Sequence, residues 1–293
     1  MEPLKIHSMP ATFRRPIMLL AFTGWNDAAE AATTAARYLT ASFSGEKFAE
    51  IDPEEFYHFG LSRPYVRFKP GSETEREVVW PVTEFSIAQT TDLSRDLIVG
   101  VAPEPHLRWR TYCDTVLQLA RTCEVSLVLT LGALLAEVPH TKPVRLVGSA
   151  SDPELAARFG LRPTRYEGPT GIVGVLNTLC RDQELPCASL WANVPHYISG
   201  IENPKASLAL VKRVLTLLGA ETDLSDLDEA GRQFDQNLRE IVAQNAKIAN
   251  YIAKLEAKDT EEEAGAAPAQ SDLPPASELV AEIEQFLRQQ RPE

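Results

Sequence analysis

Short apolar runs alternate with alanine-rich or amphipathic segments along residues 1–219 of this chain. The run 17–22 is continuous, which predicts a strand buried on both faces, as in a parallel sheet. Gly24 follows it, and the alanine-rich segment 28–41 is typical of a helix. Further apolar runs recur along the chain, most of them leading into a helical pattern: 96–101, 125–132, 144–151 and 187–194. This succession predicts βαβ units and therefore an α/β fold, with a mostly parallel central sheet between two layers of helices.

Residues 47–82 have a different pattern, in which short alternating stretches are bounded by prolines. The stretches 65–68 and 77–80 flank Pro70 and Gly71, a pair of residues typical of a tight turn. We therefore expect a hairpin here, as an antiparallel extension or an edge of the main sheet.

The C-terminal part divides into three segments after the core domain 1–219. Residues 220–258 predict one long helix, whose seam residues recur at spacings of four and three: Phe234, Leu238, Ile241, Asn245, Ile248, Ile252 and Leu255. We expect this interaction helix to pack on a partner helix or a neighbouring subunit, with the polar Asn245 fixing the register. The acidic, then Pro- and Ala-rich segment 259–275 predicts a disordered linker. Residues 276–293 predict a short amphipathic tail helix that needs a surface to dock against.

Charge and composition narrow the class of protein. The net charge is −12, nearly all of it after residue 220, so the core is almost neutral and the C-terminal part is acidic. Nucleic-acid binding needs a basic surface, so we expect no nucleic-acid partner. No apolar run approaches the length of a membrane helix, and the N-terminal residues do not read as a signal peptide. The four cysteines form no Cys-x-x-Cys pair, which predicts buried free thiols and a cytoplasmic protein without a membrane partner.

Glycines and polar residues near the ends of the apolar runs are the candidates for a ligand site. The carboxyl ends of parallel strands meet at one edge of a sheet, where a glycine turn and a helix N-terminus can hold an anion or a sugar. The candidate ligand-binding residues are Thr23, Gly24, Trp25, Asn26, Gly132, Gly148 and Thr170. For most of them a purely structural role is the simpler interpretation, such as a turn glycine or a helix cap.

Catalytic motifs are missing from the sequence. It has no Gly-x-Gly-x-x-Gly, no phosphate-binding P-loop, no Gly-x-Ser-x-Gly and no His-Glu-x-x-His, so we expect no cofactor and no metal. As an alternative, Asp27, His140 and Glu167 are candidates for acid, base and sugar-binding roles in the crevice.

Four segments in order resemble the proteasome assembly chaperone 2 family, in its bacterial branch. They are 22–28 (Phe-Thr-Gly-Trp-Asn-Asp-Ala), 147–153 (Val-Gly-Ser-Ala-Ser-Asp-Pro), 166–171 (Tyr-Glu-Gly-Pro-Thr-Gly) and 194–197 (Val-Pro-His-Tyr) with 203–206 behind it. The resemblance implies an α/β/α sandwich similar to that of purine nucleoside phosphorylases and subunits that associate into small oligomers. It also implies a binding or assembly role rather than a reaction. Tails that dock on proteasomes end in a hydrophobic residue, a tyrosine and any last residue; because 291–293 are Arg-Pro-Glu, we expect no docking by tail insertion.

Two functions are compatible with these observations. The first is a non-enzymatic, assembly-chaperone-like protein that binds itself, possibly as a trimer, and an unidentified protein partner through its core and its C-terminal helix. The alternative is a nucleoside- or phosphate-binding enzyme, similar to a phosphorylase or a hydrolase, that uses the crevice at the carboxyl ends of the strands.

Overall fold

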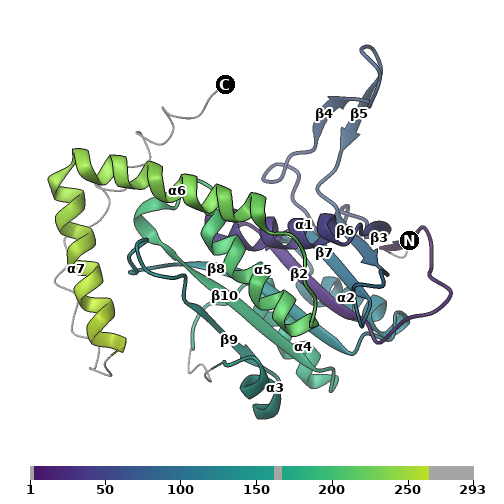
Figure 1. The fold of residues 1–293 in the computed structure, drawn as a ribbon. Coiled ribbons are helices and arrows are strands. Elements are labelled where there is room, and N and C mark those ends of the chain that lie inside the picture. The colour runs from purple at the N-terminus through teal and green to yellow at the C-terminus, as the bar shows by residue number, and fades with distance from the viewer. Residues whose placement is uncertain (1–2, 162–166, 264–293) are drawn as a thin grey trace.

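The computed structural model describes residues 3–161 and 167–263, and an eight-stranded sheet forms its centre. The strand order is β1-β3-β6-β7-β2-β8-β10-β9 (Figure 1). The four inner strands run parallel to one another: β7 (Leu97–Pro103), β2 (Ile17–Thr23), β8 (Leu127–Ala136) and β10 (Cys187–Pro195). The α/β fold predicted from the apolar runs is therefore confirmed.

Helices cover both faces of this sheet (Figure 1). One layer contains α1 (Ala31–Ser42) and α5 (Pro204–Leu218), and the other contains α2 (Trp109–Thr122) and α4 (Ile172–Asp182). Strand β2 serves both layers, because successive side chains of a strand point to opposite faces. Leu19 packs with the α1 and α5 layer, and Met18 with the α2 and α4 layer.

Antiparallel strands extend the sheet on both sides. The outer strands are β1 (Leu4–Ile6), β3 (Glu46–Ile51) and β6 (Thr83–Ala88) on one side and β9 (Leu146–Ala150) on the other. The prediction that 144–151 belongs to the parallel succession was wrong, because a parallel return needs a long crossover and 137–145 is too short for one. Gly132 and Gly148 also lie within β8 and β9 rather than at strand ends.

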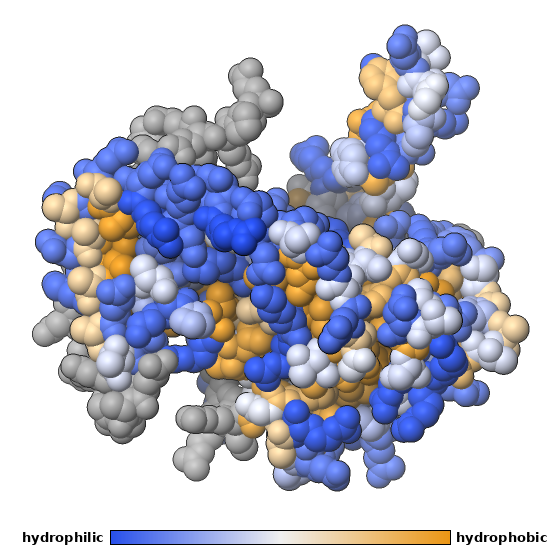
Figure 2. Space-filling view, in the orientation of Figure 1, coloured by the Kyte–Doolittle hydropathy of each residue, from blue (hydrophilic) through white to orange (hydrophobic). Residues whose placement is uncertain are grey.

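The predicted hairpin is present as a separate two-stranded sheet of β4 (Tyr65–Phe68) and β5 (Arg76–Val79). Gly71 lies in its turn with a φ of 78°, which a glycine adopts readily. The hairpin does not join the main sheet but projects away from it (Figure 1), and the space-filling view shows hydrophobic side chains on its surface (Figure 2).

The predicted single helix over 220–258 is two helices, α6 (Ser225–Gln244) and α7 (Ala246–Glu263). They meet at Asn245, whose backbone is extended (φ −136°, ψ 102°) and whose Oδ1 accepts hydrogen bonds from the N–H groups of Lys247 at 3.0 Å and Ile248 at 3.3 Å. Asn245 therefore begins α7 instead of fixing a seam register, because its side chain competes with helical hydrogen bonds and favours caps.

The other six seam residues are buried together with Tyr197 and Ile198. The apolar seam is thus covered within the chain, by the two helices and η2, which corresponds to the expected packing on a partner helix rather than on a neighbouring subunit. Asp259 was expected to begin a disordered linker, yet it lies in α7 and its carboxylate is 2.8 Å from the Arg145 guanidinium. The rest of the linker from residue 264 on, and the tail 276–293, lie outside the described residues.

The remaining short elements are α3 (Pro153–Arg158) and two 3-10 turns, η1 (Ala28–Glu30) and η2 (His196–Ile198). All four cysteines are free and buried, as predicted. Burial raises the pKa of the Cys113 thiol to about 12 and that of the Cys123 thiol to about 11. None of the helices that the structure describes is long and apolar enough to cross a bilayer.

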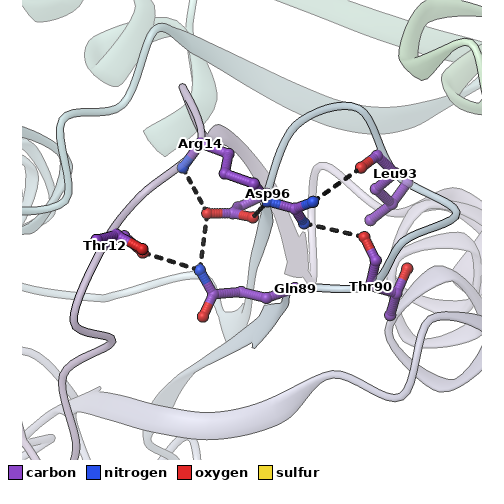
Figure 3. Close-up of polar contacts among 6 residues, drawn as sticks. All are labelled: Thr12, Arg14, Gln89, Thr90, Leu93 and Asp96. Atoms are coloured by element: carbon purple, nitrogen blue, oxygen red, sulfur yellow. Dashed lines mark hydrogen bonds and ion pairs between the residues drawn. The ribbon is translucent and has the colours of Figure 1, made fainter.

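A polar cluster closes the amino edge of the sheet, where β2 and β7 begin (Figure 3). Asp96 is fully buried and accepts hydrogen bonds from the Arg14 N–H and Nε, both at 2.7 Å, and from Gln89 Nε2 at 2.8 Å. The Arg14 guanidinium also donates to the carbonyl oxygens of Thr90 and Leu93. Burial alone would raise the pKa of Asp96, but these hydrogen bonds and the Arg14 charge outweigh it and lower the pKa.

Candidate functional site

The side chain of Glu104 links several elements at the carboxyl edge of the sheet, although no sequence motif marks this residue. Glu104 directly follows β7, and its Oε1 accepts hydrogen bonds from Asn26 Nδ2 at 2.7 Å and from the Ile172 N–H at 2.8 Å. The first contact holds the loop after β2, and the second satisfies the first turn of α4. A carboxylate at a helix N-terminus is favourable because it faces the positive end of the helix dipole. Glu104 thus fixes three elements at one point.

Asp27 holds the start of α1. It is 6% exposed, and its Oδ1 accepts hydrogen bonds from the N–H groups of Ala32 at 2.7 Å and Thr33 at 3.3 Å. Its Oδ2 accepts the Thr33 hydroxyl at 2.5 Å. Burial raises the pKa of Asp27, and these hydrogen bonds only partly offset that effect. Asp27 therefore caps the first turn of α1, and its carboxylate is engaged.

Three backbone features keep this corner compact. Gly24 has a φ of 103°, a conformation that L side chains rarely adopt. Gly171 precedes α4, and a Cβ there would overlap Asn26 Oδ1 and lie 2.7 Å from Glu104 Oε1. Ala29 and Glu30 both have a φ of 53° although neither is a glycine, which costs about 1–2 kcal/mol for each residue. The surrounding contacts therefore hold a strained turn at the mouth of the site.

A large cavity of about 1490 Å³ opens beside this corner, over the end of β8 and along parts of β10 and β9. The polar groups that line it include Asn177, Arg181 and Arg145. Arg181 donates to the Ala150 carbonyl oxygen at 3.2 Å. The Oδ1 atoms of Asn26 and Asn177 are buried and have no hydrogen-bond partner among the described residues, so each of these two amides can still accept a hydrogen bond.

Apolar side chains form the rim of the cavity, and we define the rim as Trp25, Leu134, Leu135 and Val147. Trp25 is 65% exposed, and the other three are between 37% and 49% exposed. Exposed apolar groups gathered around a cavity mark interaction surfaces more often than scattered ones do.

Gly132 shapes the floor of the cavity beside this rim. A Cβ on it would overlap the indole ring of Trp191, so the glycine lets that ring lie flat across β8 and line the cavity.

The structure brings most of the predicted ligand-binding residues to this cavity. Five of them line it: Gly24, Trp25, Asn26, Gly148 and Thr170. Thr23 and Gly132 do not line it. Of the three residues predicted for the alternative catalytic role, only Asp27 lines the cavity, whereas Glu167 is exposed outside it.

His140 lies elsewhere, at a smaller cavity of about 220 Å³ near α6 and α7. His140 is buried, and its Nδ1 and backbone N–H are each 2.8 Å from the Tyr197 hydroxyl. Burial, and then the Lys205 charge, lower the pKa of His140 to about 4, so the imidazole is neutral at pH 7. The three candidate catalytic groups are therefore not assembled in one place.

Several lining residues were missed because their signals are weak in a sequence. Asn177 and Arg181 lie in the middle and the last turn of α4, where polar residues usually face solvent. Glu104 lies between two prolines after an apolar run, and that position could have marked it. Thr170 was expected to cap the following helix, but Glu104 accepts the Ile172 N–H instead. Within residues 3–161 and 167–263, no group of three or more His, Cys, Asp or Glu side chains could hold a metal ion.

The fold and its carboxyl-edge cavity are those of a three-layer α/β/α protein with a projecting hairpin and two C-terminal helices. The chain belongs to the PAC2 family, whose model matches residues 21–242. The family resemblance drawn from the four sequence segments is therefore confirmed. A comparison with curated proteins found no match.

Solved structures agree with this assignment. A PAC2 family protein from Streptomyces avermitilis is 42% identical, with a TM-score of 0.75 over 80% of this chain and 99% of that one. A Mycobacterium tuberculosis proteasome-assembly chaperone homologue is 40% identical, with a TM-score of 0.73 over 80% of this chain and 99% of that one. The archaeal proteasome activator PbaB of Pyrococcus furiosus is 18% identical, with a TM-score of 0.66 over 82% and 99%, and shares the fold alone.

Proposed function

We propose that this chain is a non-enzymatic, assembly-chaperone-like protein that binds polypeptides, its own copies included, at the apolar rim of the carboxyl-edge cavity. The observation that carries the proposal is the rim itself: Trp25 is exposed beside three further exposed apolar side chains. Large exposed aromatic rings of this kind act as anchors in protein interfaces. The Mycobacterium tuberculosis relative, a proteasome-assembly chaperone homologue, suggests proteasome subunits as the partner to test first. We place this activity in the cytoplasm.

The chemistry of the cavity favours this function over the enzymatic alternative. The described lining residues with charged side chains are Asp27, Arg145 and Arg181. Asp27 caps a helix and Arg145 pairs with Asp259, so neither is available as an acid or a base without breaking a structural contact. The two unpartnered amide oxygens are the feature that would suit a small ligand instead, and a direct binding test separates the two functions.

The experiment combines two measurements on the full chain. In a thermal-shift titration with purine nucleosides and inorganic phosphate, we expect no stabilisation, whereas a ligand at 100 times its Kd would add about 2.7 kcal/mol. In native mass spectrometry with purified proteasome subunits of the same organism, we expect a complex that Trp25→Asp weakens at least about tenfold. Met9→Asp, which changes an exposed apolar residue outside the cavity lining, is the matched control. Turnover of a nucleoside that is lost in Asn177→Ala would contradict the proposal.

A further inference from the structure

The β4–β5 hairpin presents an apolar face that no other described part of the chain covers. Val66 lies opposite Val78, and Phe68 lies two residues further along β4, so the three side chains share one face of the hairpin. Val66 is 59% exposed, Phe68 50% and Val78 49%. No hydrophobic cluster of the described residues includes a residue of this hairpin. We define these three side chains as the hairpin face.

A hairpin of this kind needs a partner to be well ordered. Isolated two-stranded hairpins are marginally stable in water, and they become stable when a hydrophobic face packs against something else. At the base of this hairpin, Phe59 packs against Trp80, with the ring centroids 5.0 Å apart. Beyond that point the hairpin projects from the body (Figure 1), and hydrophobic side chains are visible on it (Figure 2). The hairpin face is therefore an interaction surface that this copy of the chain leaves open.

The hairpin and the cavity rim lie at the same edge of the sheet but beside different strands. The hairpin leads into β6, which is antiparallel to β7, so it leaves at the carboxyl end of β7. The cavity lies over β8, β10 and β9, and from β6 to β10 there are four strand steps, or about 19 Å at the usual strand spacing. Two different surfaces can be paired between copies in a head-to-tail contact, which gives a ring if the rotation between copies closes and a filament if it does not.

Charge complementarity supports a second copy as the occupant of the cavity. Glu73 lies in the hairpin turn without an ion-pair partner among the described residues, whereas the neighbouring Glu75 pairs with Lys69 at 2.9 Å. In the cavity, Arg181 contacts a carbonyl oxygen and has no carboxylate partner in the described part of the chain. The hairpin thus brings the Glu73 carboxylate at its turn and a face on which the Arg76 guanidinium lies 4.9 Å from the centroid of the Phe68 ring. The cavity offers the Arg181 guanidinium to the carboxylate and an apolar rim with the Trp25 ring to that face.

We propose that the β4–β5 hairpin of one copy inserts into the carboxyl-edge cavity of a second copy, with the hairpin face packed against the rim. This inference rests on the proposed function, in which the rim binds polypeptide, and it identifies the polypeptide. Each cavity is then completed by residues of the neighbouring subunit, and the contact is heterologous because different surfaces meet. The occupants that the test has to exclude are residues 276–293 of the same chain and an unrelated partner.

The test measures the mass in solution of the full chain and of two variants that each disable one surface. Sedimentation velocity of the wild-type chain should show a multimer at about 100 µM. Phe68→Asp disables the hairpin and Trp25→Asp disables the rim, so each variant alone should be a monomer. A 1:1 mixture of the two variants retains one intact hairpin and one intact rim, so it should form a dimer. Recovery of the dimer also shows that both variants are folded.

Matched controls separate the hairpin face from the hairpin as a whole. Tyr65→Asp changes a 57% exposed residue on the opposite face of β4 and should leave the multimer unchanged. Glu73→Arg should weaken association about tenfold, and adding Arg181→Glu to it should restore much of the loss.

Three results would overturn the inference. The first is a wild-type chain that is still monomeric at about 100 µM. The second is a multimer that Trp25→Asp breaks but Phe68→Asp does not; the rim would then bind a different polypeptide and the proposed function would stand. The third is a multimer that forms only after residues 264–293 are deleted, which would identify the chain's own tail as the occupant. If neither Trp25→Asp nor Phe68→Asp has an effect and a nucleoside or phosphate stabilises the chain, the proposed function itself fails.

Discussion

The two edges of the central sheet differ in how completely their polar groups are paired. At the amino edge, the buried Asp96 has three hydrogen-bond donors, and the Arg14 guanidinium is held by a carboxylate and two carbonyl oxygens. The charged groups there are paired, although the buried Thr90 hydroxyl beside them has no partner among the described residues. At the carboxyl edge, buried oxygens of Asn26 and Asn177 have no partner among the described residues, and the rim exposes apolar side chains. A closed polar cluster stabilises the fold, whereas an unpaired polar atom beside an apolar rim suits binding. The contrast separates the edge that stabilises the fold from the edge at which we propose binding.

Removal of Asp96 should have the largest effect on stability. Asp96→Ala leaves the Arg14 and Gln89 donors unpaired, and we expect a loss of about 2–4 kcal/mol, less than for a fully buried pair because Arg14 is partly exposed. Urea unfolding measures this loss. Arg232→Ala, which removes an exposed ion pair with Glu229, is the control and should change the free energy of unfolding by less than about 0.5 kcal/mol.

The same variant has a defined pH dependence. The pKa of Asp96 is lowered in the folded state, so its stabilising contribution is complete above the ordinary aspartate pKa and is lost as the pH falls through the lowered value. The difference between the wild type and Asp96→Ala should therefore shrink on acidification. A difference that stays constant down to the lowest accessible pH would contradict the role given to the ionised carboxylate.

Gly148→Ala should have the next largest effect on stability, because the added methyl group has no room in the close packing under the cavity. Its Cβ would overlap the Ser189 carbonyl oxygen, a backbone atom that cannot move aside, and we expect a loss of about 1–3 kcal/mol. Gly231→Ala is the matched control, because its Cβ finds only Lys205 Cγ at 3.5 Å. That helical substitution should be neutral or stabilise by up to about 1 kcal/mol in thermal unfolding.

Truncation of Trp25 should separate stability from binding. Because the side chain is largely exposed, Trp25→Ala should change the free energy of unfolding by less than about 0.5 kcal/mol. The same change should weaken polypeptide binding at the rim at least about tenfold, measured by sedimentation or native mass spectrometry. A large loss of stability with unchanged association would mean that the ring serves the fold, and the contrast between the edges would fail.

Asp27→Asn should produce the smallest change in the free energy of unfolding. The change of this effect with pH should have the opposite sign to that expected for Asp96. Burial raises the pKa of Asp27, so the folded state binds the carboxyl proton more tightly than the unfolded state does. The tighter proton binding stabilises the fold at low pH, and this contribution is lost as the pH rises through the raised pKa. An asparagine keeps the Oδ1 acceptor for Ala32 and Thr33 without the charge. The stability of the variant relative to the wild type should therefore increase between pH 4 and pH 7 in urea titrations.

The sequence predicted the regular parts of the fold well because they follow from local periodicity. The buried run that became β2 and the hairpin around Gly71 were both read from apolar spacing and turn residues. The α6–α7 break was missed because Asn245 fits a heptad position as well as a cap, and only tertiary packing decides between them.

The site was predicted only in part for a related reason. Gly24 and Asn26 lie in one segment and were found from it. The Asn26–Glu104 contact joins residues 78 apart in the chain, which local pattern cannot show. His140 was placed near the crevice, whereas its loop turns toward Tyr197 and the C-terminal helices. The sequence thus gives the edge where the site lies, and long-range contacts decide which side chains reach it.

The burial of all four native thiols makes this chain a convenient object for site-directed labelling. A maleimide reacts with the thiolate, and burial both shields Cys113 and Cys123 and keeps them protonated at neutral pH. A single cysteine introduced on the hairpin or at the rim would then take up a fluorophore or a spin label with little background. Distances between labels on neighbouring subunits could be followed in the otherwise native protein, without first replacing its own cysteines.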